Sequence, residues 1–226
     1  MNKQLFRPLE ISEKLIRLGE VHDGGYIINE GSLNCDCLFT YGIGTSCLFE
    51  EEWETKTGKP SFLYDMTVDS PTLLPKMKFF KEGLSGTKQR NTDNFLNHYA
   101  KEGITSKNVL LKIDVEGAEY EWLQNTDIKK LADIVSCLIV EFHSVFSEPF
   151  EEQINILKKF YNIIHVHGNN NGSVRNEIPE VPEITFLRKD SSIFLQETKE
   201  KYPKKDIDSI NNIEKIDMTI DFSTTT

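Results

Sequence analysis

The apolar residues of this chain fall into two patterns that alternate along its length. Apolar runs typical of strands lie at 38–41, 61–64, 108–113, 135–143, 162–168 and 184–188, with a plausible edge strand at 78–82. Amphipathic stretches typical of helices lie at 48–54, 92–99, 118–124 and 150–161. Strands that alternate with helices predict an α/β protein: a doubly wound, mostly parallel seven-stranded sheet flanked by helices.

The two ends of the chain differ from this middle part. Apolar residues at roughly helical spacing predict an N-terminal helix, which leads into a turn at Asp23–Gly24–Gly25; they are Leu9, Ile11, Leu15, Ile16 and Leu18. The turn is either a hairpin or a lid that cradles a ligand. Polar residues dominate beyond Lys189, which predicts a tail that wraps the surface or is partly loose. We therefore divide the chain into 1–34 (helix and turn segment), 35–190 (Rossmann-like domain) and 191–226 (polar extension).

A glycine turn follows the first strand of the Rossmann-like part. Gly42–Ser46 ends the strand, and Asp65 closes the next strand 23 residues after Gly42. In such a βαβ unit the turn faces a nucleoside, and the acid accepts hydrogen bonds from ribose hydroxyls. The third glycine of the dinucleotide fingerprint is missing, since Cys47 holds its place. NAD is therefore disfavoured, whereas S-adenosylmethionine carries no phosphate and needs only a close backbone and a few polar groups.

The ends of the later strands carry polar side chains that suit chemistry. The run from Leu110 to Glu119 changes from apolar residues to Asp114 and Glu116 at a strand-to-helix corner. These carboxylates either stabilise a helix N-terminus or face a ligand, because ligands bind beyond the carboxyl ends of parallel strands. Glu141 with His143, and His167 with Asn169, follow the next two strands. We expect all of them at one edge of the sheet.

Each histidine has its own expected role. His143 or His167 could remove a proton from an acceptor hydroxyl, and His22 could contact the substrate. His98 falls inside a predicted helix and is expected at the surface. His165 and His167 lie on one strand face, so a divalent metal held by Asp114, Glu141 or His143 and His167 is left open, although no metal is predicted.

Composition excludes several classes of protein. The net charge is −10 and no basic stripe exists, which argues against nucleic acid as a partner. No apolar run is long enough for a membrane span, and the N-terminus lacks a signal peptide, so a cytoplasmic protein is expected. The four cysteines do not suggest a disulfide framework or a zinc site.

The quoted motifs resemble one known family. The run Leu111-Lys112-Ile113-Asp114-Val115-Glu116-Gly117-Ala118-Glu119 is similar to the signature of FkbM-type methyltransferases, which are S-adenosylmethionine-dependent enzymes of class I. The resemblance extends over roughly residues 20–190, including Tyr41–Ser46, Tyr64–Thr67, Glu141–His143 and His165–Asn170. Relatives with an upstream Asp-Gly-Gly-Tyr decorate bacterial surface polysaccharides. The resemblance therefore implies methyl transfer to a hydroxyl of a nucleotide sugar or of a polysaccharide sugar.

The resemblance also implies a set of site residues. The expected cofactor contacts are Gly42, Ile43, Gly44, Thr45, Ser46, Asp65, Met66, Gly83, Leu84, Ser85 and Asp114. The expected catalytic residues are His143, His167, Asp114 and Glu116, and the expected substrate contacts are His22, Asp23, Gly24, Gly25, Tyr26, Glu141 and Asn169. An NAD-linked sugar dehydrogenase or epimerase, and a non-catalytic assembly subunit, remain as alternatives. A homo-oligomer is left open.

Overall fold

The computed structural model describes residues 1–191 and 193–223, and its centre is one mixed sheet. The sheet has seven strands in the order β11-β14-β10-β9-β4-β5-β6. The strands are β4 (Cys37–Tyr41), β5 (Ser61–Tyr64), β6 (Met77–Phe80), β9 (Val109–Ile113), β10 (Val135–Glu141), β11 (Tyr161–Gly168) and β14 (Pro182–Arg188). Only β14 runs antiparallel to its neighbours, β10 and β11. The predicted doubly wound, mostly parallel sheet is confirmed.

The strand order reverses between β4 and β9. The chain leaves β4 toward β5 and β6 on one side, and β9 and β10 extend the sheet on the other side. The loops that follow β4 and β9 therefore diverge at one edge of the sheet, which creates the crevice where open α/β sheets bind ligands. The glycine turn follows β4 and the acidic corner follows β9.

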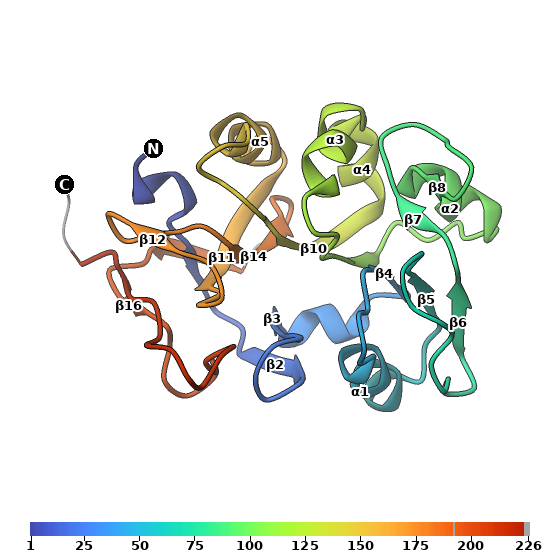
Figure 1. Cartoon of the computed structure of the whole chain (residues 1–226), viewed down its shortest axis with the longest axis horizontal. Helices are drawn as coiled ribbons and strands as arrows, with labels where there is room; N and C mark the ends of the chain where they lie inside the picture. The colour runs from blue at the N-terminus through green and yellow to red at the C-terminus, as the bar shows by residue number, and fades with distance from the viewer. Residues whose placement is uncertain (192, 224–226) are drawn as a thin grey trace.

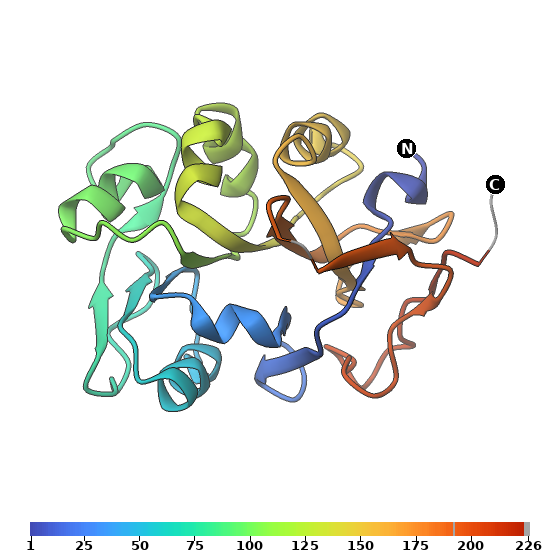
Figure 2. The same cartoon turned by 180° about the vertical axis from the view of Figure 1, so that it is seen from behind.

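Helices cover one face of the sheet, and a helix and a hairpin cover the other (Figures 1 and 2). The first face packs α2 (Phe95–Lys101), α3 (Ala118–Gln124), α4 (Ile128–Ile134) and α5 (Phe150–Leu157). The second face packs α1 (Leu48–Thr57) and the hairpin of β2 (Leu15–Gly19) and β3 (Gly25–Asn29). Successive strand residues pack on opposite faces: Leu111 lies in the core of the first face and Leu110 in that of the second. This alternation is the reason why the buried strands read as continuous apolar runs.

The predicted N-terminal helix is wrong. The chain forms a short 3₁₀ helix η1 (Lys3–Phe6), then β1 (Leu9–Ile11) and the β2–β3 hairpin. The apolar residues at 9 and 11, and at 16 and 18, also fit the two-residue period of a strand, and pairing of β2 with β3 selects that period. The hairpin interpretation of the Asp23–Gly25 turn is confirmed. A 3₁₀ helix η2 (Glu30–Asn34) joins the hairpin to β4.

Two further expectations in the middle of the chain need correction. Helix α2 begins later than the predicted residue 92, because Asn94 is its N-cap and accepts a hydrogen bond from the Leu96 amide. His98 is not at the surface: its ring is 1% exposed, lies 4.2 Å from the ring of Tyr64 and is 3.0 Å from the Tyr41 hydroxyl. Helix α4 was not predicted, although Asp127 caps it.

The C-terminal extension wraps the sheet edge near β11 and contributes to the core. It contains β15 (Phe194–Glu197), which pairs with β1, and β16 (Lys201–Tyr202), which pairs with β17 (Ile220–Asp221). Tyr202 and Phe222 are buried, and the Phe222 ring lies 6.3 Å from that of Phe6. The remaining short strands are β7 (Gly83–Leu84), β8 (Thr92–Asp93), β12 (Val174–Arg175) and β13 (Ile178–Pro179). None of the helices within the described residues could cross a membrane.

Candidate active site

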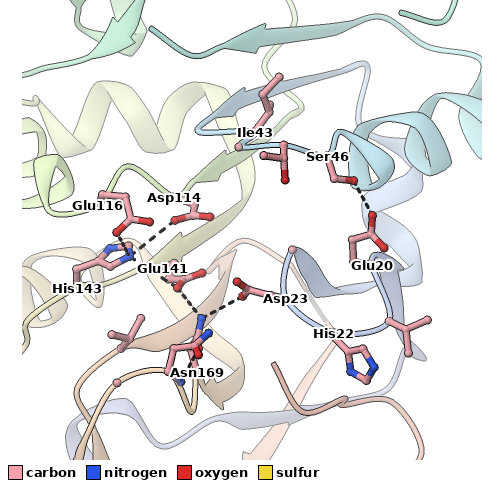
Figure 3. Close-up of a pocket in the computed structure, with 17 residues that line it drawn as sticks. Glu20, His22, Asp23, Ile43, Ser46, Asp114, Glu116, Glu141, His143 and Asn169 are labelled. Carbon is pink, nitrogen blue, oxygen red and sulfur yellow. Dashed lines mark hydrogen bonds and ion pairs between the residues drawn. The ribbon is translucent and has the colours of Figure 1, made fainter. Parts of the chain in front are cut away.

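A cavity of about 730 Å³ opens at the carboxyl edge of the sheet, beside the point where the strand order reverses. It is lined by the hairpin turn at 20–24, the loop at 43–46, the acidic corner after β9, the end of β10, the loop after β11, and Val181. Figure 3 shows Ile43 and Ser46 on one side and Asp114, Glu116, Glu141 and His143 on another. The fold thus brings together segments that lie far apart in the sequence.

Most of the residues expected at the site line this cavity. They are His22, Asp23, Gly24, Ile43, Gly44, Thr45, Ser46, Asp114, Glu116, Glu141, His143 and Asn169. The hairpin turn therefore also forms part of the cavity wall, where Glu20 joins it and accepts a hydrogen bond from the Ser46 hydroxyl at 2.6 Å. Among the lining residues that the structure describes, five are acidic and none is lysine or arginine.

The loop after β4 is held by Asp65. One carboxylate oxygen of Asp65 accepts hydrogen bonds from the amides of Ile43 and Gly44, at 3.0 and 3.2 Å. The other oxygen accepts from the amide and hydroxyl of Thr67, at 2.8 and 2.6 Å. Burial alone would raise the pKa of Asp65, but these hydrogen bonds together bring it below its ordinary value. Asp65 is thus ionised, and its hydrogen bonds hold the loop in place.

Gly42 locks this loop to the acidic corner. Its φ is +76°, and a Cβ at this position would lie 1.6 Å from the backbone oxygen of Asp114. The carbonyl of Gly42 accepts a 2.8 Å hydrogen bond from Lys112 Nζ, and its amide donates to the Tyr64 carbonyl at 3.0 Å. Only glycine permits this approach of the two loops. Lys112 was not anticipated, although a lysine inside an apolar strand run was a visible signal.

Tyr26 ties the two strand ends together beneath the cavity. Its buried hydroxyl lies 2.8 Å from Asp114 Oδ2 and 3.2 Å from Glu141 Oε2. Asn169 Nδ2 donates to Glu141 Oε1 at 3.0 Å and to Asp23 Oδ1 at 3.2 Å. Burial, followed by the nearby carboxylates of Asp114, Glu183 and Asp23, raises the pKa of Glu141 well above its ordinary value.

His143 stands at the centre of the carboxylates. Its Nε2 lies 3.3 Å from Glu116, 3.7 Å from Glu141 and 3.9 Å from Asp114. On the other side, its Nδ1 is 3.3 Å from Oε1 of the fully buried Glu119, which also accepts the His143 backbone amide at 2.7 Å. Burial lowers the pKa of His143, but Glu119 and the other carboxylates outweigh it, so the pKa is raised. Glu119 was not anticipated as a site residue.

The other expected site residues lie outside the cavity lining. Gly25 and Tyr26 lie just behind the hairpin turn, and Gly42 and Asp65 lie beneath the glycine loop. Met66 follows β5, and its sulfur would lie 3.1 Å from a Cβ placed on Gly83; Leu84 and Ser85 are buried next to Gly83. The structure does not place His167 on the cavity wall: its side chain is 2% exposed and its Nδ1 lies 3.3 Å from Glu183.

The C-terminal extension reaches the same network. Asn211 Nδ2 donates to Asp23 Oδ1 at 3.0 Å and to Glu183 Oε1 at 2.7 Å. His165 and His167 do share a strand face, and the extension supplies a carboxylate to each: Asp208 at 3.1 Å and Asp217 at 3.6 Å. Sequence reasoning missed these partners, because nothing in a polar tail shows which of its acids will be buried.

The ion pairs of His167 predict a loss of stability at alkaline pH. Burial disfavours the imidazolium, but Asp217 and Glu183 outweigh it and raise the pKa of His167 to about 10. Protonated His167 therefore stabilises the fold fully below its unfolded pKa of about 6.5, and this stabilisation is lost as pH rises toward 10. We expect the melting temperature to fall between pH 7 and pH 10 by about 2–4 °C for each kcal/mol lost. Equal pH slopes for wild type and His167→Gln in calorimetric melts would contradict this.

The sheet is of the class I methyltransferase type, and the glycine loop and the acidic corner lie together at its carboxyl edge. The chain belongs to the FkbM methyltransferase family: the model of the methyltransferase FkbM domain matches residues 29–187. The resemblance seen in the sequence is confirmed, and the protein is a methyltransferase.

Two solved structures resemble the chain distantly. The fibrillarin pre-rRNA processing protein of Methanococcus jannaschii is 12% identical, with a TM-score of 0.42 over 80% of this chain and 84% of that one. A putative riboflavin biosynthesis protein from Shewanella sp. PV-4 is 13% identical, with a TM-score of 0.27 over 72% of this chain and 81% of that one. No curated protein matches the chain.

Proposed function

We propose that this methyltransferase uses S-adenosylmethionine to methylate a hydroxyl of a carbohydrate. The observation that carries the proposal is the acidic cavity between the glycine loop and the His143 carboxylates, lined by no lysine or arginine among the described residues. The cofactor supplies a methyl carbon bound to a positively charged sulfonium, and it bears an ammonium group. An acidic wall suits both positive charges, whereas it would repel the pyrophosphate of a dinucleotide.

The glycine loop fits such a cofactor. A Cβ placed on Gly44 would meet no atom within 4 Å, so the backbone there is open on the cavity side. Thr45 and Ser46 add hydroxyls to the same wall. In this proposal the loop binds the amino-acid part, Asp65 holds the loop and the ribose end, and Met66 with Gly83–Ser85 lies toward the base.

The opposite wall suits a polyhydroxyl acceptor. Asp23, Glu141 and Asn169 offer carboxylate and amide groups that hydrogen-bond to hydroxyls, and His22 lies on the same side of the opening. Methyl transfer forms an oxygen–carbon bond, breaks the carbon–sulfur bond and releases the hydroxyl proton. Glu116 and His143 are the basic groups closest to the open side, so one of them accepts this proton.

The cofactor can be tested by calorimetry with the purified chain. We expect S-adenosylmethionine and its demethylated product to bind, and Asp65→Ala to weaken binding by about 10- to 100-fold, because two amides of the loop lose a charged partner worth about 1.5–3 kcal/mol. Asp69→Ala is the matched control, since this carboxylate follows the same strand but is 97% exposed. Absence of cofactor binding to wild type would overturn the proposal.

The acceptor requires a separate experiment. Labelled S-adenosylmethionine is incubated with a panel of nucleotide sugars and neutral glycans, and the label is located in the product by mass spectrometry. Incorporation at a sugar oxygen supports the proposal. Incorporation only at nitrogen, or only into protein or nucleic acid, would contradict the acceptor class while leaving the cofactor assignment intact.

A further inference from the structure

Asp114, Glu141 and His143 converge in the cavity. One ligating atom from each of the three side chains lies within 4.8 Å of the others. They come from the ends of two adjacent parallel strands, β9 and β10, so the backbone of the sheet fixes their separation. From this geometry we propose that the three side chains bind a divalent cation of the Mn²⁺ or Mg²⁺ class.

The two distances to His143 suit the binding of one ion. His143 Nε2 lies 3.9 Å from Asp114 Oδ1 and 3.7 Å from Glu141 Oε1. Two ligands that are each about 2.1 Å from one ion are at most about 4.2 Å apart. Both pairs fall inside this limit. Two carboxylates and one imidazole leave coordination positions for solvent or substrate oxygens, as a catalytic ion requires.

The surrounding hydrogen bonds already orient the ligands. Tyr26 occupies Asp114 Oδ2 and Glu141 Oε2, the carboxylate oxygens other than those measured to His143. Glu119 accepts at His143 Nδ1, which places the proton there and leaves the lone pair of Nε2 directed at the carboxylates. A buried carboxylate behind a metal-binding histidine is the usual second layer of such sites. This arrangement is independent of the acidity of the cavity itself.

The charge of the region also calls for a cation. Asp23 and Glu183 are linked to the cluster through Asn169 and Asn211. Glu141 itself is almost fully buried beside these carboxylates. No lysine or arginine is present among the described lining residues. A divalent ion at Asp114, Glu141 and His143 would balance these charges where they are densest.

The ion settles which group removes the proton in the proposed reaction, and this role, unlike metal binding itself, rests on the proposed function. With Nε2 of His143 occupied, Glu116 is the remaining basic group at the cluster, and its carboxylate is 86% exposed. A hydroxyl bound to the ion has a lower pKa, so a carboxylate can accept its proton near neutral pH. His143 is then a ligand, and Glu116 is the base.

Metal binding can be measured without cofactor or acceptor. Mn²⁺ is titrated into chelator-treated protein, and free Mn²⁺ is followed by its electron paramagnetic resonance signal. We expect saturable binding of one ion per chain, competition by Mg²⁺, and at least about tenfold weaker binding in His143→Gln and Asp114→Asn. Glu20→Gln removes the same charge from the same cavity and is expected to bind Mn²⁺ as wild type does.

Several outcomes would overturn the inference. Absence of saturable Mn²⁺ binding to folded wild type, or equal affinity in His143→Gln, Asp114→Asn and Glu20→Gln, contradicts the site. Thermal melts show whether each variant is folded. If His143→Gln does not fold, Asp114→Asn alone tests the site. If S-adenosylmethionine binds normally but Mn²⁺ does not, the metal site is rejected and the proposed function is kept. If Mn²⁺ binds but S-adenosylmethionine does not, the proposed function is rejected and the metal site is kept.

Discussion

The Asp114→Asn variant is expected to lose about 100- to 10,000-fold in the rate of methyl transfer while keeping its fold. The amide is almost isosteric with the carboxylate and can still accept the hydrogen bond that Tyr26 donates at 2.8 Å. It lacks the negative charge that faces His143 Nε2 at 3.9 Å. The measurement is the rate at which the demethylated cofactor forms with an acceptor from the panel.

A matched control separates this effect from a general change of charge. Asp190→Asn removes one carboxylate at the surface, where Asp190 pairs with Arg188 and is 66% exposed. It is expected to keep the wild-type rate. A wild-type rate in folded Asp114→Asn would contradict the proposed catalytic role of Asp114 and leave its carboxylate only the hydrogen bond with Tyr26.

The Gly42→Ala variant is expected to unfold far more easily than wild type. The new methyl group would meet the Asp114 backbone oxygen at 1.6 Å, and the residue would have to keep a φ of +76°. Neither backbone segment can yield without disturbing β4 and β9, so we expect a loss of more than about 3 kcal/mol. That corresponds to a fall in melting temperature of roughly 10 °C.

Gly44→Ala is the matched comparison two residues away. Its φ is +56°, but no atom lies within 4 Å of the position that the new methyl group would take, so only the backbone cost of about 1–2 kcal/mol applies. Calorimetric melts of the two variants decide the matter. Equal losses would mean that contact between the glycine loop and the acidic corner does not stabilise the fold.

The sequence was informative wherever a local pattern had one structural solution. The apolar runs at 108–113 and 135–143 predicted buried strands of an α/β sheet with polar residues at its carboxyl edge, and they form β9 and β10. The sequence was misleading where one pattern of apolar residues fits both the period of a helix and that of a strand. Residues 9–18 satisfy both a helix and a pair of strands, and only pairing of β2 with β3 decides between them.

The histidines show that the sequence did not predict which side chains surround a given residue. His98 and His143 are each a single histidine beside polar neighbours in the sequence. One is enclosed by Tyr41 and Tyr64 in the core, and the other faces the cavity. His167 was an equally good candidate for the base, yet Glu183 and Asp217 enclose it. The difference lies in residues distant in the chain, which no local pattern can reveal.

The sequence alone predicted the strands of the sheet, the glycine loop, the acidic corner at Asp114 and Glu116, and the methyltransferase family, because each shows as a pattern of residues that are close together along the chain. Only the tertiary structure decided that Tyr26 joins Asp114 to Glu141, that Glu119 supports His143, and that Asn211 of the extension completes the network. These contacts join segments from across the whole chain, and their geometry is set by packing around the sheet.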